Sequence, residues 1–110
     1  MQRLFVYGTL APGRVNHKIL ENISGCWEDA TLRGTLHQKG WGVEMGYPGI
    51  IPSENGDEVK GFLFSSEELT NNWLMLDKFE GEGYERIEVS VTVKKGNKVS
   101  AFVYALSRDT

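Results

Sequence analysis

Strict alternation of apolar and polar residues marks the stretch RIEVSVTV, residues Arg86–Val93. Its apolar members are Ile87, Val89, Val91 and Val93. Successive side chains of a strand point to opposite faces, so this pattern predicts a strand with one buried face. The turn sequence KKGNK follows and leads into a second β-rich run. The two runs together predict an antiparallel hairpin.

Runs rich in β-branched and aromatic residues predict five strands in all. These runs are Leu4–Tyr7, Ala30–Gln38, Glu58–Phe64, Tyr84–Lys94 and Val99–Leu106. Gly and Pro occur singly between them as turn markers, and the chain has no linker, repeat or low-complexity tract. The sequence therefore predicts one β-rich domain over residues 1–110.

Two segments have the spacing of helices. Val15–Ile23 repeats its isoleucines and leucine at helical intervals. The second segment, SSEELTNNWLMLDKFEG at residues 65–81, starts with a capping-box signature. In this motif Ser65 accepts a hydrogen bond from the amide of Glu68, and the Glu68 side chain reaches back to Ser65. Gly81 is placed to end the helix.

The second predicted helix carries an acidic residue on its apolar side. At about 100° per residue, Leu69, Trp73 and Leu76 form one stripe, and Glu80 continues it. Burial and the carboxyl end of the helix dipole both disfavour an anion, so both effects predict a raised pKa for Glu80. A carboxyl of that kind suits proton transfer. If the last turn of the helix frays, the Glu80 side chain would instead point out into solvent. The spacing alone leaves this alternative open.

The stretch LFVYGTLAPG, residues 4–13, ends an apolar run abruptly at Gly8. Free backbone amides of Thr9 and Leu10 after a strand would form a concavity that binds anions such as a carboxylate. Gly8 would permit close approach of such a group. A plain strand terminus is the alternative interpretation. Neither Gly-Lys-Ser nor Gly-Lys-Thr follows the turn, so it is not a phosphate-binding P-loop.

Composition narrows the class of protein. The 110 residues, 40% of them hydrophobic, suffice for a single core. A net charge of −3 gives no general attraction to nucleic acid, and no apolar run approaches the length of a membrane span. The single cysteine, Cys26, cannot form an internal disulfide and is expected to be buried. We expect a cytoplasmic monomer or small homo-oligomer whose partner is a small molecule.

Three motifs together resemble a known family. FVYGTLAPGRVNHKIL, YPGI and LDKFEGEGYERIEV are similar to segments of the γ-glutamylcyclotransferase-like proteins, especially the γ-glutamylamine cyclotransferase branch. The resemblance extends from Leu4 to about Leu106. It implies an α+β fold, with a small, mixed, barrel-like sheet and about two short helices packed outside. It also implies that Glu80 is the catalytic acid and that the substrate-binding turn consists of Tyr7, Gly8, Thr9 and Leu10.

The chemistry that this resemblance implies needs no cofactor. The α-amino group of a γ-glutamyl compound attacks the γ-carbonyl carbon, closes a five-membered ring and releases 5-oxoproline and a free amine. Glu80 moves the proton, while the turn amides hold the α-carboxylate and orient the substrate. Ala11 stands where many relatives carry a basic residue, which leaves the preferred leaving group open. A non-catalytic γ-glutamyl or amino-acid binding module and a protein-interaction domain on the same fold are the alternatives.

Two residues after the acid complete the predicted site. Tyr84 and Arg86 have equal parity in their strand, so they share a face, and both are candidate substrate-binding residues. Surface pairing with Glu82 or Glu88 is the alternative.

No metal site is predicted. The two histidines, His17 and His37, have no partner at metal-ligand spacing. The acidic residues near the end of the second helix are interpreted as a solvated turn with one inward member: Asp77, Glu80, Glu82 and Glu85.

Overall fold

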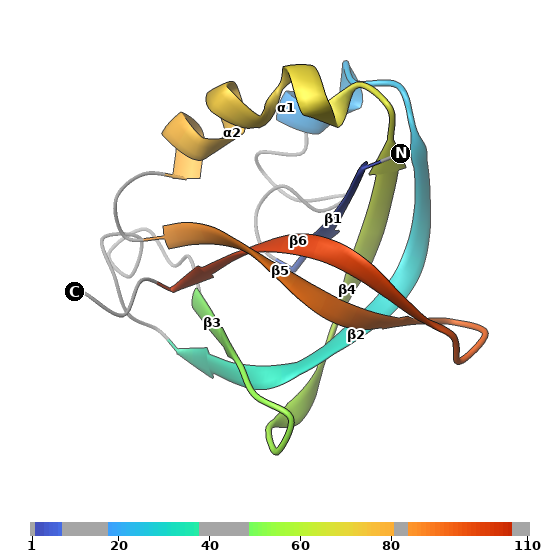
Figure 1. The fold of residues 1–110 in the computed structure, drawn as a ribbon, viewed down its shortest axis with the longest axis vertical. Coiled ribbons are helices and arrows are strands. Elements are labelled where there is room, and N and C mark those ends of the chain that lie inside the picture. The colour runs from blue at the N-terminus through green and yellow to red at the C-terminus, as the bar shows by residue number, and fades with distance from the viewer. Residues whose placement is uncertain (1, 8–17, 38–48, 81–83, 107–110) are drawn as a thin grey trace.

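The computed structural model describes residues 2–7, 18–37, 49–80 and 84–106. Its strands are β1 (Gln2–Val6), β2 (Cys26–His37), β3 (Gly49–Pro52), β4 (Asp57–Ser66), β5 (Tyr84–Val93) and β6 (Lys98–Leu106). Its helical elements are α1 (Lys18–Glu21), the 3₁₀-helix η2 (Leu69–Asn71) and α2 (Trp73–Glu80). The strands curl around a common centre, and α1 and α2 lie over the same side of them (Figure 1).

The six strands form one sheet that closes on itself. Neighbouring strands follow the order β1-β4-β2-β3-β6, and a parallel pairing of β6 with β1 completes the ring. β5 pairs with β6 along its length and reaches β2 at Ala30 and Thr31. β3 and β5 thus both pair with β2 and with β6, and they contact β2 at different positions along its length. Closure leaves few exposed strand edges, and the predicted barrel-like α+β fold with helices outside is confirmed.

The predicted antiparallel hairpin of β5 and β6 is also confirmed. Val93 donates its amide to the carbonyl of Asn97 at 2.9 Å, and Gly96 donates to the carbonyl of Val93 at 2.8 Å. Gly96 has a φ of 92°, which a residue with a Cβ rarely adopts. The turn therefore needs the glycine of KKGNK.

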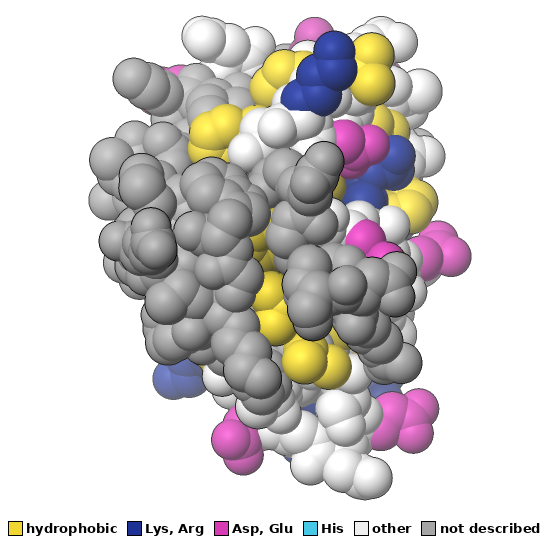
Figure 2. Space-filling model, turned by 90° about the vertical axis from the view of Figure 1, so that its left-hand side faces the viewer, with side chains coloured by type: hydrophobic (Ala, Val, Ile, Leu, Met, Phe, Trp, Pro, Cys, Tyr) yellow, Lys and Arg dark blue, Asp and Glu magenta, His cyan; other side chains and the backbone are white. Residues whose placement is uncertain are grey.

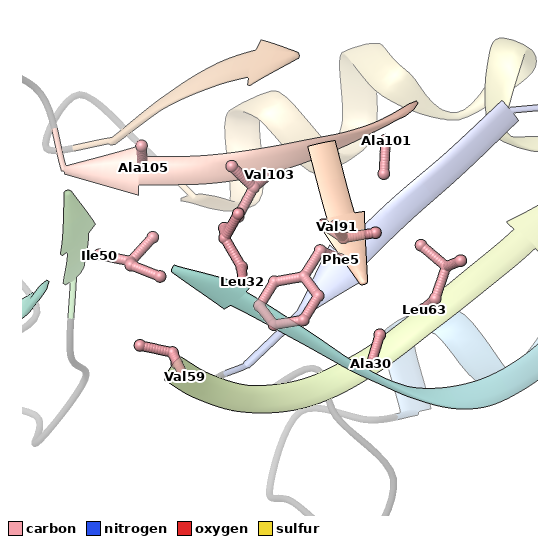
Figure 3. Close-up of a cluster of buried hydrophobic side chains, with 10 residues drawn as sticks. All are labelled: Phe5, Ala30, Leu32, Ile50, Val59, Leu63, Val91, Ala101, Val103 and Ala105. Carbon is pink, nitrogen blue, oxygen red and sulfur yellow. The ribbon is translucent and has the colours of Figure 1, made fainter. Parts of the chain in front are cut away.

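Alternate residues of the strands fill the interior of the barrel. These side chains gather at the centre of the ring in Figure 3: Phe5, Ala30, Leu32, Ile50, Val59, Leu63, Val91, Ala101, Val103 and Ala105. Ile87, Val89 and Val93 pack against this cluster, which confirms the predicted apolar face of β5. At Gly61 a Cβ would lie 2.7 Å from Cζ of Phe5 and 2.6 Å from the carbonyl oxygen of Val6. A larger residue at position 61 would therefore clash with the Phe5 ring and with the backbone of β1.

Intervening residues of these strands and residues of the helical segments together form a second cluster on the outside of the barrel. Its buried members are Leu4, Val6, Leu20, Ile23, Phe64, Leu69, Trp73, Leu76 and Tyr104. Partly buried aromatic residues pack against it: Trp27, Phe62, Phe79, Tyr84 and Phe102. The predicted stripe of Leu69, Trp73 and Leu76 is thus confirmed as the buried face of the helical segment.

The predicted single helix over residues 65–81 is wrong. Ser65 pairs with both Arg3 and Cys26 in the sheet, so β4 continues through Ser66 before the chain turns. Helical structure then comes in two pieces, η2 and α2. Pairing with two neighbouring strands stabilises the extended conformation at Ser65 more than a local cap would stabilise a helix there.

The predicted capping box is wrong for the same reason. The hydroxyl of Ser66, instead of Ser65, accepts from the Glu68 amide at 3.0 Å and donates to the carbonyl of Ser24. The Glu68 carboxylate accepts from the Ser24 amide at 3.0 Å. These bonds attach the residue after Ile23 to the start of the η2 segment, which keeps α1 against the second cluster.

The structure also differs from the sequence predictions in the bounds of the strands and in the exposure of Cys26. β3 was not predicted, and β2 begins at Cys26 instead of Ala30. Cys26 is exposed, so the expectation that it is buried is wrong. It lies at the first position of β2, where the strand emerges from the connection to α1. α1 falls within the predicted helix Val15–Ile23.

Candidate functional site

Strand ends that are far apart in sequence meet at one end of the barrel. His37, the last residue of β2, pairs with Gly49, the first of β3. Tyr84, the first residue of β5, pairs with Leu106, the last of β6. A Cβ on Gly49 would lie 2.8 Å from Cδ1 of Leu106, so the two pairs are in contact. Tyr7 follows β1 toward the same end.

The hydroxyl of Tyr7 connects the end of β1 to two other strands at this end of the barrel. The hydroxyl donates to the backbone carbonyl of Tyr104 on β6 at 2.7 Å. It also accepts from the backbone amide of Ile50 on β3 at 3.1 Å. The ring stacks on Phe5 with centroids 6.2 Å apart. Tyr7, predicted as the first residue of the substrate-binding turn, is therefore fixed to two other strands just before Gly8.

A second group of polar side chains lies between β5, β6 and α2. Arg86 contacts the Asp77 carboxylate with two nitrogens, Nε to Oδ1 at 2.9 Å and Nη2 to Oδ2 at 3.3 Å. The hydroxyl of Tyr104 donates to Oδ1 of Asp77 at 2.6 Å. Tyr104 thus takes part in both groups, through its backbone carbonyl with Tyr7 and through its side chain with Asp77.

Aromatic rings hold the Arg86 guanidinium in place. Its Cζ lies 4.4 Å from the ring centroid of Trp73 and 5.2 Å from that of Phe102. The two rings meet edge to face at 5.3 Å. Guanidinium groups over aromatic faces gain electrostatic attraction, and the planar fork suits a carboxylate.

The pKa of Asp77 reflects these neighbours. Burial alone raises it, but hydrogen bonds from Arg86 and Tyr104 and the positive charge of Arg86 lower it, and the net pKa lies below the ordinary 3.8. Asp77 is therefore an anion at neutral pH and serves as a hydrogen-bond acceptor.

Tyr84 and Arg86 share one face of β5, as predicted. Tyr84 packs against the outer cluster, and Arg86 lies over two of its rings. The described ion pair of Arg86 is with Asp77. Glu88, one of the two surface partners considered for it, accepts from the Ser100 hydroxyl at 3.1 Å instead. That Tyr84 and Arg86 contact substrate stays a prediction.

Glu80 is the last residue of α2, one turn after Asp77. The orientation of its side chain lies outside what the structure describes, so its inward direction and its catalytic role stay predictions. Several other residues of the sequence predictions lie outside the described ranges: Gly8, Thr9, Leu10, Ala11, His17, Gly81 and Glu82.

Sequence reasoning missed Asp77 and Tyr104 as parts of this arrangement. A signal for Tyr104 was present, because the turn KKGNK fixes a hairpin register in which Tyr104 lies directly opposite Arg86. Asp77 had no such signal, since its contact with Arg86 depends on where α2 packs.

Figure 2 shows the molecule from the side where β6 ends. Hydrophobic side chains are visible near the middle of this face, and acidic and basic side chains lie next to one another at its edge. Among the described residues, no three His, Cys, Asp or Glu side chains come together as a metal site would require. Within the same ranges, every helix is too short or too polar to cross a membrane.

A solved chain named "Gamma-glutamyl cyclotransferase" has the same fold, with a TM-score of 0.66, 23% sequence identity and coverage of 96% of this chain and 66% of that one. An AIG2-like protein from Mus musculus has the same fold, with a TM-score of 0.72, 28% sequence identity and coverage of 97% of this chain and 78% of that one. The sequence matches the family "Gamma-glutamyl cyclotransferase, AIG2-like" over residues 4–110. The chain therefore belongs to this family.

Two named relatives agree with this assignment. The "Gamma-L-glutamyl-butirosin B gamma-glutamyl cyclotransferase" of Niallia circulans is 32% identical over 114 aligned positions, which cover 99% of this chain and 69% of the relative. "AIG2-like protein B" of Arabidopsis thaliana is 40% identical over 98 positions, covering 88% of this chain. This chain spans only 53% of the Arabidopsis protein.

Proposed function

We propose that this protein is a cofactor-independent cyclotransferase that acts on a γ-glutamyl amine or peptide. The α-amino nitrogen forms a bond to the γ-carbonyl carbon, and the bond from that carbon to the leaving nitrogen breaks. The protons lost by the attacking nitrogen end on the leaving nitrogen. The products are 5-oxoproline and a free amine, so the reaction needs no external nucleophile, metal or redox partner.

The observation that carries this proposal is the convergence at one end of the barrel. Tyr7, which precedes the proposed turn, bonds to the backbone of Tyr104. The side chain of Tyr104 bonds to Asp77, one helical turn before Glu80. The two parts that the reaction requires, a carboxylate-binding turn and an acid-base group, thus follow residues that one described chain of hydrogen bonds connects.

In the proposed site, the amides of Gly8, Thr9 and Leu10 hold the substrate's α-carboxylate. Glu80 accepts a proton from the α-ammonium group, which frees the attacking amine. The attacking nitrogen loses a second proton as the ring closes, and both protons end on the leaving nitrogen, so the amine departs in its protonated form. Holding the carboxylate orients the chain for ring closure, and such orientation supplies much of the acceleration in intramolecular reactions. Tyr84 and Arg86 border the substrate.

The packing of the barrel supports a site at its end. The interior is filled by the ten side chains of Figure 3, as is usual for small barrels. A small-molecule substrate therefore binds outside this core. The name of the Niallia relative makes γ-glutamyl compounds the class to test first. A cytoplasmic location and a monomeric or small homo-oligomeric state stay predictions.

The test measures 5-oxoproline after incubation of the purified protein with γ-glutamyl amines and dipeptides, with and without a metal chelator. Release from at least one compound, undiminished by the chelator, is expected. Glu80→Gln keeps the shape of the side chain and removes its proton exchange, so turnover should fall by at least about 100-fold. Glu67→Gln, at an exposed glutamate between β4 and η2, is the matched control and should keep native turnover.

Each outcome has a distinct meaning. No release from any compound would contradict the proposed activity. Calorimetric binding of a γ-glutamyl compound without release would support the non-catalytic binding module. Full activity of Glu80→Gln would show that another group moves the proton.

A further inference from the structure

The last turn of α2 depends on contacts with the barrel for its position. α2 has eight residues, and helices this short are marginal without tertiary packing. Trp73 and Leu76 anchor its first half in the outer cluster. At the carboxyl end, the last carbonyls of a helix have no partners within the helix, so the last turn frays readily.

Asp77 is the polar anchor of that last turn. Both of its carboxylate oxygens accept hydrogen bonds, Oδ1 from Arg86 and Tyr104 and Oδ2 from Arg86. Two-point contact with a guanidinium fixes the plane of a carboxylate as well as its distance. The third bond comes from a different strand, so Asp77 is held by β5 and β6 together.

The donors to Asp77 are themselves fixed. Arg86 lies over the rings of Trp73 and Phe102, and Tyr104 is a buried residue of β6. The backbone carbonyl of Tyr104 accepts from Tyr7. A continuous series of contacts therefore runs from the end of β1 to the last turn of α2.

These contacts are better suited to placing the helix than to stabilising the fold. The Asp77 side chain is 41% exposed and that of Arg86 is 26% exposed. Ion pairs with that much solvent access contribute little to the stability of the fold. Their geometry, by contrast, removes most of the rotational freedom of Asp77 and of the turn that carries it.

We propose that Asp77 is a positioning residue for catalysis: held by Arg86 and Tyr104, it sets the last turn of α2, and hence Glu80, at a fixed place relative to the end of β1. This inference rests on the proposed function and assigns it a residue outside the substrate-binding set. Asp77 touches neither substrate nor the transferred proton. It acts through the helix, because Glu80 follows it by one turn.

The test compares kcat and KM for 5-oxoproline release in native protein, Asp77→Asn and Tyr104→Phe. Misplacement of a catalytic group by about 1 Å can cost about 100-fold, so loosening of the turn should lower kcat about tenfold in Asp77→Asn and somewhat less in Tyr104→Phe. KM should change less than twofold, because the carboxylate-binding turn is untouched. Asp29→Asn, the same chemical change at an exposed position of β2, should leave both constants native.

A double variant, Asp77→Asn with Tyr104→Phe, distinguishes a positioning role from two independent structural defects. If Tyr104 acts through Asp77, the two changes together should lower kcat by no more than Asp77→Asn alone, since contacting residues are not additive. All rates are expressed per folded molecule, with folding checked by circular dichroism. Should Asp77→Asn fail to fold, Tyr104→Phe decides, because it keeps the ring and the carbonyl that accepts from Tyr7.

Native kcat in the folded Asp77 or Tyr104 variant would overturn the inference, and so would a loss confined to KM or a multiplicative loss in the double variant. Failure of the proposed function looks different: the native protein itself would then release no 5-oxoproline, and the positioning role would fall with it.

Discussion

The inside and the outside of the barrel wall are built from alternate residues of the same strands, yet they differ in chemistry. Among the described residues, the buried side chains of the interior are aliphatic apart from Phe5, against which Tyr7 stacks. The outer layer is rich in aromatic residues and includes Tyr104, whose hydroxyl bonds to Asp77. Polar atoms in such a layer need partners, and here the partners are groups on α2 and β5. The interior stabilises the barrel, while the outer layer places the helix.

This division leads to a matched pair of tests, because each region contains a fully buried leucine that can be truncated in the same way. Leu63 of the interior is 1% exposed, and Leu76 of the outer layer is 0% exposed. The same truncation at both positions compares the two environments without a change of chemistry.

Leu63→Ala should have the largest effect on stability. Leucine to alanine in a core costs about 2–5 kcal/mol, and the cost is higher where the surroundings cannot collapse. Closed sheet surrounds Leu63, so we expect the upper part of that range in urea unfolding. Leu36→Ala, at a 47% exposed leucine of β2, is the control and should cost less than about 1 kcal/mol. A loss at Leu63 no larger than at Leu36 would contradict a rigid interior.

Leu76→Ala should cost less stability and more activity. The helix can move toward the barrel and fill part of the space, so we expect the lower part of the range of about 2–5 kcal/mol. The same movement displaces the last turn of α2, so kcat per folded molecule should fall further than in Leu63→Ala. Leu74→Ala, at a 71% exposed leucine of the same helix, should change neither quantity. Equal kcat in Leu63→Ala and Leu76→Ala would contradict the claim that the outer layer places the helix for catalysis.

Asp77→Asn should have the smallest effect on stability, and this effect should depend on pH. The pKa of Asp77 is lower in the folded protein than the ordinary 3.8, so its ionised form stabilises the fold. That contribution is fully present above the unfolded pKa and is lost as the pH falls through the folded pKa. The melting temperature of the native protein should therefore exceed that of the variant slightly at pH 6, and the difference should vanish in strong acid. A difference that stays constant from pH 6 to pH 2 would assign the effect to shape instead of charge.

Local pattern was sufficient wherever one element determined its own conformation. The alternation of Ile87, Val89, Val91 and Val93 predicted the buried face of β5, and KKGNK predicted the hairpin. The helical spacing of Leu69, Trp73 and Leu76 predicted a buried face even though the helix is divided into η2 and α2. Side-chain periodicity survives such a break because the burial of each residue still depends on the same neighbouring surface.

Local pattern failed where partners distant in sequence determined the outcome. Ser65 and Glu68 have the spacing of a capping box, but pairing of β4 with β1 and β2 keeps Ser65 in a strand. β3 has four residues and includes Pro52, too few to show a period. Its residue type predicts that Cys26 is buried, yet its place at the start of β2 exposes it.

The sequence by itself predicted the two-faced strands, because these depend on residue types at short, regular spacing. Its motifs also identified the family, and that resemblance implies the candidate residues Glu80 and Tyr7–Leu10. Only the tertiary structure decided that β1 and β6 close the ring, and that Asp77, Arg86 and Tyr104 meet beside α2. Those contacts join residues nine and 27 positions apart in the chain. Their geometry depends on how a helix packs on a closed sheet, and no local spacing encodes that packing.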